Sequence, residues 1–209
     1  MKKYLLIAVA ALAIASCSEK KYHVEGSIAQ AKDSLLVFEN VGIEEITVVD
    51  SIRLGEDGAF SFSGDAQDAP EFYRLRIGGQ IINVSIDSTE TITIKADYPQ
   101  MATKYEVSGS DNCLKIKELA LKQIDLRQRA IAISENEDLT VQATNDSIYN
   151  MIRQYKEDIK KNYIYAEPDK AYAYLALFQT LGDMLLFNPR ADREDIKAFA
   201  AVATSWDAN

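Results

Sequence analysis

Histidine and cysteine are scarce in this 209-residue chain, which contains one histidine and two cysteines. A Ser-His-Asp triad needs a histidine, and we expect His23 at the surface, where the first strand begins. Two cysteines cannot form a disulfide scaffold, and no His, Cys or acidic residues have the close spacing of a zinc site. No glycine-rich phosphate loop is present either. The sequence therefore predicts no metal, no cofactor and no catalytic residue in this chain.

Basic residues are outnumbered by acidic ones. Lys and Arg total 23 and Asp and Glu total 32, so the formal charge is −9. A nucleic-acid binder needs clustered Lys and Arg to neutralise phosphates, and we therefore expect no nucleic-acid partner. Apolar residues make up 47% and charged residues 26%, which is the balance of a globular rather than a disordered chain.

The apolar stretch at the N-terminus is too short to cross a membrane. It runs for twelve residues from Tyr4 to Ala15, whereas a transmembrane helix needs about 20. Lys2 and Lys3 precede it, and it closes with Ile14-Ala15-Ser16-Cys17. A positive start followed by a short apolar core is typical of a secretory signal, and the closing four residues resemble the bacterial lipobox.

The lipobox resemblance implies that residues 1–16 are a signal peptide, recognised at Ile14, Ala15 and Ser16, and that Cys17 becomes a lipid-acylated N-terminus followed by a tether over 17–20. Because the chain is acidic, membrane attachment would depend on the lipid. One glutamate followed by two lysines matches an acidic surface-export tag poorly. We therefore expect a lipid-anchored protein of the cell envelope, on the outer membrane and facing the periplasm; the alternative is an ordinary signal with an incidental cysteine.

Residues 21–108 alternate short β-favouring stretches with turn residues, which predicts an antiparallel β-sandwich of about eight strands. Phe60 and Phe62 alternate with serines and so share one face. Glycines place turns at 55–58 and 78–79. No helix separates the strands, which argues against a parallel α/β fold. The expected strands are 21–28, 34–40, 45–54, 58–63, 71–77, 80–86, 91–97 and 104–108.

Residues 109–209 have the helical period, so we expect about four helices and an α+β fold class. Ser110 or Asp111 is expected to cap a first helix ending near Ile133, and Pro168 to lie in the first turn of a third. The expected apolar stripes are Ile148, Ile152, Tyr155 and Ile159 in the second helix, Ala171, Leu175, Phe178 and Leu181 in the third, and Ile196, Phe199, Ala200 and Ala203 in the fourth.

Charged residues of the helical half are expected in structural positions. The acids at 192, 194 and 195 are interpreted as a solvated face or a helix start, where the helix dipole favours negative charge. The lysines at 156, 160 and 161 are interpreted as the solvated side of the second helix.

Cys113 is expected at the start of the first helix, where a thiol pKa can be lowered. It has no C-x-x-C partner, so we expect a buried or incidental thiol. Six of the eleven tyrosines lie between 149 and 174. We expect them in helix–helix contacts, with an aromatic ligand groove as the alternative.

A series of short motifs runs through the strand half, at 22–28, 50–51, 57–64 and 70–75. Together they resemble the domain of unknown function that precedes thioredoxin-like domains of the TlpA, ResA or AhpC/TSA type in bacterial lipoproteins. The helices that follow resemble the linker region of such proteins. The resemblance implies structural roles for Gly26, Asp50, Ser51, Asp57, Gly58, Phe60, Phe62, Gly64 and Tyr73.

A thioredoxin domain needs a βαβ core and usually a C-x-x-C motif, and this chain has neither. We therefore expect residues 109–209 to stop short of such a domain. The expected function is the non-catalytic N-terminal region of a lipid-anchored thiol-disulfide oxidoreductase, serving as a spacer, partner-selection or dimerisation module for an envelope protein or peptide. The alternative is a self-contained periplasmic or surface lipoprotein that binds a peptide or glycan without enzyme activity.

The anchor is testable by replacing the lipidated residue. Cys17→Ser should abolish incorporation of labelled fatty acid and move the protein from the membrane to the soluble fraction, because no other residue offers a thiol at the cleavage point. Cys113→Ser is the matched control and should leave labelling unchanged. Labelling that persists in the Cys17 variant would rule out the lipobox interpretation.

Overall fold

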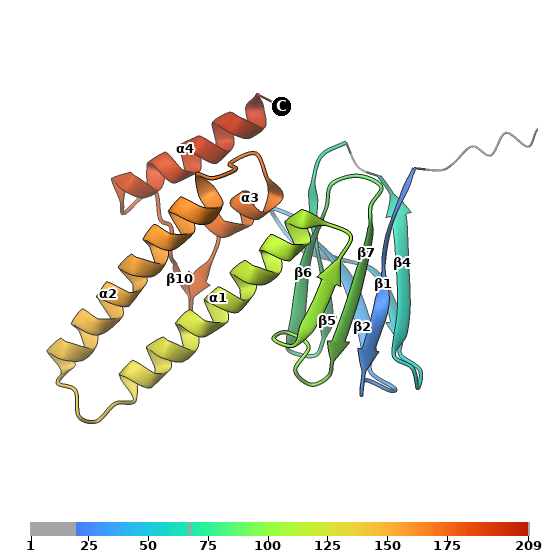
Figure 1. The fold of residues 1–209 in the computed structure, drawn as a ribbon, viewed down its shortest axis with the longest axis horizontal. Coiled ribbons are helices and arrows are strands. Elements are labelled where there is room, and N and C mark those ends of the chain that lie inside the picture. Colours follow the sequence, from blue (N-terminus) through green and yellow to red (C-terminus); the bar gives the residue numbers. More distant parts are fainter. Residues whose placement is uncertain (1–19, 67, 209) are drawn as a thin grey trace, which may run out of the picture.

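The alternating pattern of residues 21–108 produces eight strands in the computed structural model, which describes residues 20–66 and 68–208 (Figure 1). Their lengths follow the expected stretches closely, and each of the predicted glycine turns, at 55–58 and 78–79, joins two consecutive strands. The strands are β1 (Lys21–Ala29), β2 (Leu35–Val41), β3 (Ile46–Arg53), β4 (Ala59–Asp65), β5 (Glu71–Ile77), β6 (Gln80–Ile86), β7 (Thr91–Asp97) and β8 (Tyr105–Ser108).

The eight strands form two four-stranded sheets, ordered β4-β1-β7-β8 and β3-β2-β5-β6. Along the chain, β2–β3 and then β5–β6 belong to one sheet, whereas β1, β4 and β7–β8 belong to the other. The chain therefore crosses to the other sheet and returns twice before β7 pairs with β1. That return makes β1–β7 a parallel pair, whereas every other pair within the sandwich is antiparallel. The inward faces of the two sheets supply one apolar core, which includes Phe38, Phe62 and Leu75.

Four helices follow, which confirms the α+β fold class. Ser110 caps the first helix as expected, with its Oγ accepting a hydrogen bond from the Cys113 N–H at 3.3 Å. Thr140 caps the second helix in the same way. The elements of this half are α1 (Asp111–Ser134), α2 (Val141–Ile159), a π-helical turn η1 (Lys160–Ile164), α3 (Ala171–Leu177), β9 (Thr180–Leu181), β10 (Met184–Leu185) and α4 (Arg193–Asp207).

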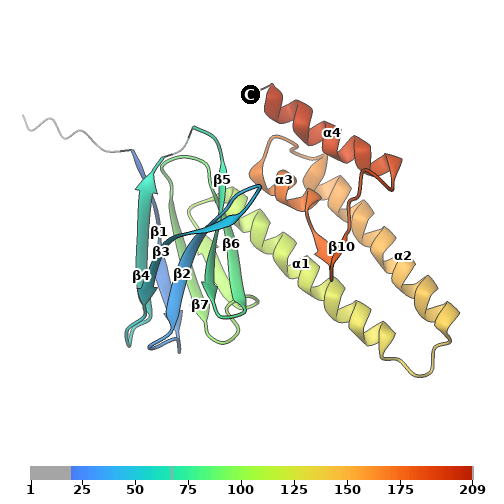
Figure 2. The same cartoon turned by 180° about the vertical axis from the view of Figure 1, so that it is seen from behind.

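The helices pack mainly on one another. Their buried apolar side chains form a second core cluster, separate from that of the sandwich. Figures 1 and 2 show α1 and α2 side by side as a long hairpin that points away from the sandwich, with α3 and α4 at the end nearer the sheets. Only the first turns of α1 contact the sheets extensively, against β6 and β8.

The predicted third helix is too long. α3 ends at Leu177, and Leu181 lies instead in the short hairpin β9–β10. The reason is the turn at Gly182, whose φ of +59° suits the two-residue loop of a β-hairpin. Pro168 lies before the helix, in a turn closed by a 3.1 Å hydrogen bond from the Lys170 N–H to the Glu167 carbonyl.

The buried face of α4 also differs from the predicted one, since the buried residues are displaced by one position from the expected stripe of 196, 199, 200 and 203. Ile196 is 48% exposed, whereas Ala198 and Val202 are buried together with the carboxylate of Asp195. Apolar residues lie on both sides of this helix, so period alone could not identify the face that is covered.

Asp195 is the centre of a buried ion cluster. Its side chain has no exposed surface; Lys156 Nζ lies 2.7 Å from Oδ2, and Lys160 Nζ lies 3.2 Å from Oδ1. The Asn188 N–H also donates to Oδ2, at 2.8 Å. Asp195 lies in the first turn of α4, which is the helix-start position expected for it. The expectation that Lys156 and Lys160 face solvent is wrong, because α4 folds back onto the end of α2 and covers them.

We predict that Asp195→Asn lowers the free energy of unfolding by about 3 kcal/mol. It removes the buried counter-charge that both lysines share, and leaves them only the longer contacts of Lys156 with Asp192 at 3.4 Å and of Lys160 with Glu157 at 3.9 Å. Urea unfolding followed by circular dichroism measures the change. Glu194→Gln is the matched control on the adjacent exposed position, and we expect a loss of no more than about 1 kcal/mol there. Equal losses in the two variants would contradict the structural role of the cluster.

Candidate functional site

The glycines of the resemblance motifs keep β1 close to its neighbours. Gly26 has a φ of +151°, and a Cβ at this position would lie 1.7 Å from the Ile94 carbonyl oxygen. At Gly58, where φ is +63°, a Cβ would lie 2.0 Å from the Ile28 carbonyl oxygen. Any side chain at either position would force the backbones apart.

The motif aromatics fill the sandwich core. Phe62 and Tyr73 stack on the two sides of Phe38, with ring centroids 5.1 and 5.0 Å from it. Phe60 contacts Phe62 at 5.9 Å. Gly64 faces the ring of Tyr22, leaving no room for a side chain.

The polar motif residues make local contacts. Asp50 accepts a hydrogen bond from the Ser51 N–H, and Asp57 accepts one from the Ala59 N–H in the turn before β4. The aromatic motif residues thus lie in the sandwich core, and the polar ones make short-range contacts near the surface. The predicted lipobox, 14–17, lies outside the described residues.

The Cys113 thiol is buried in the sandwich core cluster although it belongs to α1. Its Sγ donates to the Ser85 carbonyl oxygen at 3.3 Å. Burial raises the pKa of this thiol to about 11, despite the hydrogen bonds that lower it. The expected buried thiol is confirmed, and its raised pKa favours the protonated form at neutral pH.

The tyrosines of the helical half mainly make the expected contacts between elements. Tyr155 donates to the Gln179 side chain at 2.9 Å, and Tyr163 donates to Glu118 at 3.1 Å. Tyr172 packs edge-on against Tyr163. Within 20–66 and 68–208, no three His, Cys or acidic residues lie close enough to hold a metal ion. No helix in this part of the chain is long and apolar enough to cross a membrane.

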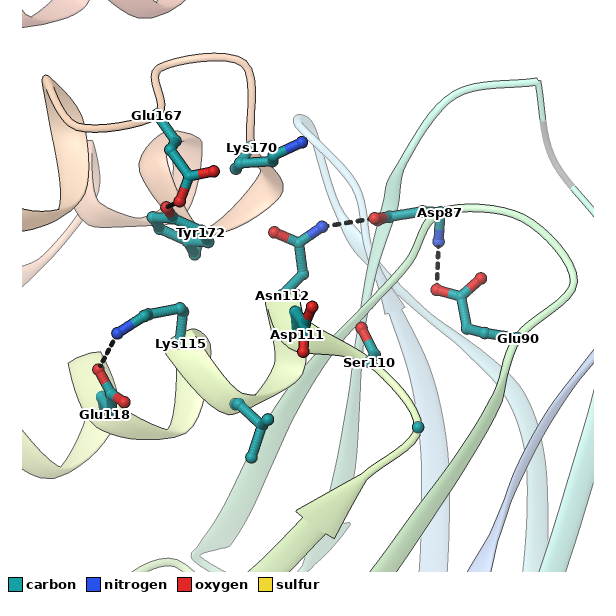
Figure 3. Close-up of a pocket in the computed structure, with 12 residues that line it drawn as sticks. Asp87, Glu90, Ser110, Asp111, Asn112, Lys115, Glu118, Glu167, Lys170 and Tyr172 are labelled. Carbon is teal, nitrogen blue, oxygen red and sulfur yellow. Dashed lines mark hydrogen bonds and ion pairs between the residues drawn. The ribbon is translucent and has the colours of Figure 1, made fainter.

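A cavity of about 720 Å³ lies where the sandwich meets the helical half; we call it the junction pocket (Figure 3). Three segments form it. The β6–β7 turn contributes one wall, the start of α1 another, and the turn before α3 the third. The lining residues are Asp87, Glu90, Gly109, Ser110, Asp111, Asn112, Leu114, Lys115, Glu118, Glu167, Lys170 and Tyr172.

The β6–β7 wall is held by Glu90. Its two carboxylate oxygens accept the backbone N–H groups of Asp87 at 2.7 Å and of Ser88 at 2.8 Å. Asp87 in turn accepts a hydrogen bond from the Asn112 side-chain amide, which joins this turn to α1. Burial raises the pKa of Asp87, while the bond from Asn112 opposes that rise.

Two side chains of the pocket, Asp87 and Asn112, each have a buried oxygen without a hydrogen-bond partner among the described residues. Asn112 is only 9% exposed, and its unpartnered atom is Oδ1. Figure 3 shows this oxygen directed away from Asp87, toward the side where Lys170 and Tyr172 lie. A buried polar atom without a partner costs about 1–3 kcal/mol, so this position favours a molecule that can donate a hydrogen bond.

The pocket was missed at the level of sequence because its walls are far apart along the chain. Asn112 has the appearance of an ordinary residue in the first turn of a helix, and Asp87 that of a turn residue. No spacing rule joins them, since their contact depends on the angle at which α1 leaves the sandwich.

No curated protein matches the chain. Among solved structures, an (S)-allantoin synthase has 9% identity, 45% of each chain covered and a TM-score of 0.32. A 9R-lipoxygenase from Cyanothece PCC8801 has 10% identity, 82% of this chain and 32% of the other covered, and a TM-score of 0.26. The chain spans less than half the length of either protein, and similarity at this level supports no conclusion about fold or function.

A family model does match the strand half. The matched segment begins in β1 and includes every strand of the sandwich, but it is less than half of the whole chain. It ends in the first turn of α1, at the cysteine that belongs to the sandwich core. Residues 22–113 thus match the model described as a domain of unknown function (DUF4369).

Proposed function

We propose that this chain is the non-catalytic N-terminal region of a lipid-anchored thioredoxin-like thiol-disulfide oxidoreductase of the cell envelope, and that it serves as a rigid spacer. The observation that carries the proposal is the stiff joint between its halves. Only Gly109 and Ser110 separate β8 from α1, and the first turns of α1 pack against β6 and β8.

A second contact stiffens the joint. Phe72 projects from the outer face of β5 and stacks on Tyr174 of α3, with ring centroids 5.3 Å apart. Tyr174 also contacts Trp206 of α4 at 5.3 Å. Through these contacts the joint holds α4, the last helix described, in one position relative to the sandwich.

The described residues supply no thiol for disulfide exchange. Exchange needs an accessible thiolate and, for release of the mixed disulfide, a second thiol. Cys113 is the one free cysteine within 20–66 and 68–208; it is buried and protonated. In this proposal the redox chemistry therefore belongs to another domain, and these residues hold that domain away from the membrane.

A second candidate function is ligand binding by a lipoprotein without enzyme activity. The junction pocket favours it, because a cavity of about 720 Å³ with an unpaired buried amide oxygen is the size of a small-molecule site.

We predict that Cys113 does not react in the folded protein. In a Cys17→Ser background, iodoacetamide at about pH 8 should leave Cys113 unmodified, because its thiol stays protonated and enclosed. Unfolding in urea should expose it to complete modification, which mass spectrometry measures. The folded chain should also fail to reduce insulin above background. Fast native labelling, or reduction lost on Cys113→Ser, would show a reactive thiol.

The spacer function makes a prediction about the gene. We expect the reading frame beyond codon 209 to encode a C-x-x-C motif within about one domain length, 100 to 150 residues. DNA sequencing or mass spectrometry of the native protein tests this. A stop codon directly after Asn209 would refute the proposal and leave the ligand-binding candidate.

A further inference from the structure

The junction pocket has an excess of negative charge. Five carboxylates line it, at 87, 90, 111, 118 and 167, against two ammonium groups, at 115 and 170. The formal sum is therefore 2 − 5 = −3. The N-terminus of α1 lies at this pocket, and a helix dipole favours negative charge at that end. Asp111 already supplies such a charge in the first turn, so the pocket as a whole repels an anion.

Several of these charges are already used within the protein. Glu90 holds the β6–β7 turn, and Lys115 pairs with Glu118 at 2.8 Å. Lys170 pairs with Asp169, outside the pocket lining, at 3.3 Å. Hydrogen-bond acceptors remain: Asp111 has no partner among the described residues, and Glu167 uses one carboxylate oxygen, Oε2, for the Tyr172 hydroxyl at 2.6 Å.

The third free acceptor is the Asn112 oxygen. Its side chain is held in place because the amide nitrogen donates to Asp87, and this leaves Oδ1 as an acceptor on the opposite side. The aliphatic part of a lysine lies nearby, since Lys170 extends across this region in Figure 3. Because Lys170 is a partly exposed side chain, its displacement would give a ligand access to the oxygen.

The surplus of acceptors decides the class of ligand. A metal ion is not favoured, because no three His, Cys or acidic residues within 20–66 and 68–208 lie close enough to hold one. A neutral sugar would leave the excess negative charge uncompensated. An organic cation supplies both the missing positive charge and N–H donors.

We propose that the junction pocket binds a primary ammonium group, with the buried Asn112 oxygen as its hydrogen-bond acceptor and the exposed carboxylates of Asp111 and Glu167 as the surrounding negative charge. This inference deepens the second candidate function and rests on it. A lysine side chain of a peptide and a free polyamine share this chemistry, and the probes below distinguish them.

The test is isothermal titration calorimetry of the purified full chain at low ionic strength. The probes are spermidine and N-acetyl-lysine methylamide, with glucose and acetate as the uncharged and anionic comparisons. We expect saturable binding of the ammonium probes alone. Tighter binding of the lysine derivative would identify a peptide side chain as the source of the ammonium group, and tighter binding of spermidine a polyamine.

The double variant Asp111→Asn, Glu167→Gln should weaken binding about tenfold, because it removes two acceptor charges from the rim. Its matched control is Asp125→Asn, Glu194→Gln, which removes the same net charge from exposed positions of α1 and α4. Asn112→Ala should also weaken binding, because it removes the buried acceptor. If that variant does not fold, the double variant Asp111→Asn, Glu167→Gln alone tests the site. A selective loss supports the site.

If the double variant at Asp111 and Glu167 and its control lose the same amount of affinity for the ammonium probes, the proposal is overturned, because that result would indicate general charge attraction. The absence of binding by either ammonium probe, or binding of acetate or glucose instead, would also overturn it. None of these results bears on the spacer function, which the reading frame beyond codon 209 tests separately.

Discussion

Cys113 lies in the core of the sandwich although it belongs to the first turn of a helix, and its Sγ donates to the Ser85 carbonyl oxygen at 3.3 Å. This contact, together with the bond from Asn112 to Asp87, determines where α1 leaves the sheets. The direction of α1 in turn places α2, α3 and α4. The stiff joint and the junction pocket therefore share one origin, since a helix docked on the edge of a sandwich leaves a hollow where its first turn meets the nearest loop.

Buried charge stabilises each half of the molecule in a similar way. In the sandwich, the buried Glu39 of β2 pairs with Arg74 and Arg76 of the neighbouring strand β5 at 2.5 and 2.6 Å. Hydrogen bonds from Arg76 and then Arg74 lower the pKa of Glu39 to about 2, against the effect of burial. In the helical half, Asp195 joins α4 to the end of α2. In both places one acid satisfies two basic side chains, which gives the pairing the geometry that enclosed charges need.

The two candidate functions depend on the same joint. A spacer needs a fixed relation between its anchor end and the helices, which the packing of α1 on β6 and of Phe72 on Tyr174 provides. A binding module needs a cavity with unsatisfied groups, which the same joint leaves beside Asn112. The joint also keeps two walls of the pocket in a fixed relative position, because a hydrogen bond joins the β6–β7 turn to the start of α1.

The sequence by itself determined the eight strands, the glycine turns and the inward face of β4, because alternation and turn chemistry are local properties. It also indicated a buried thiol at Cys113. Only the tertiary structure decided the parallel β1–β7 pair, the early end of α3, the buried face of α4 and the burial of Lys160 and Asp195. These features depend on which distant segments cover one another. The junction pocket belongs with them, since its acceptors come from three segments that meet only after both halves have folded and docked.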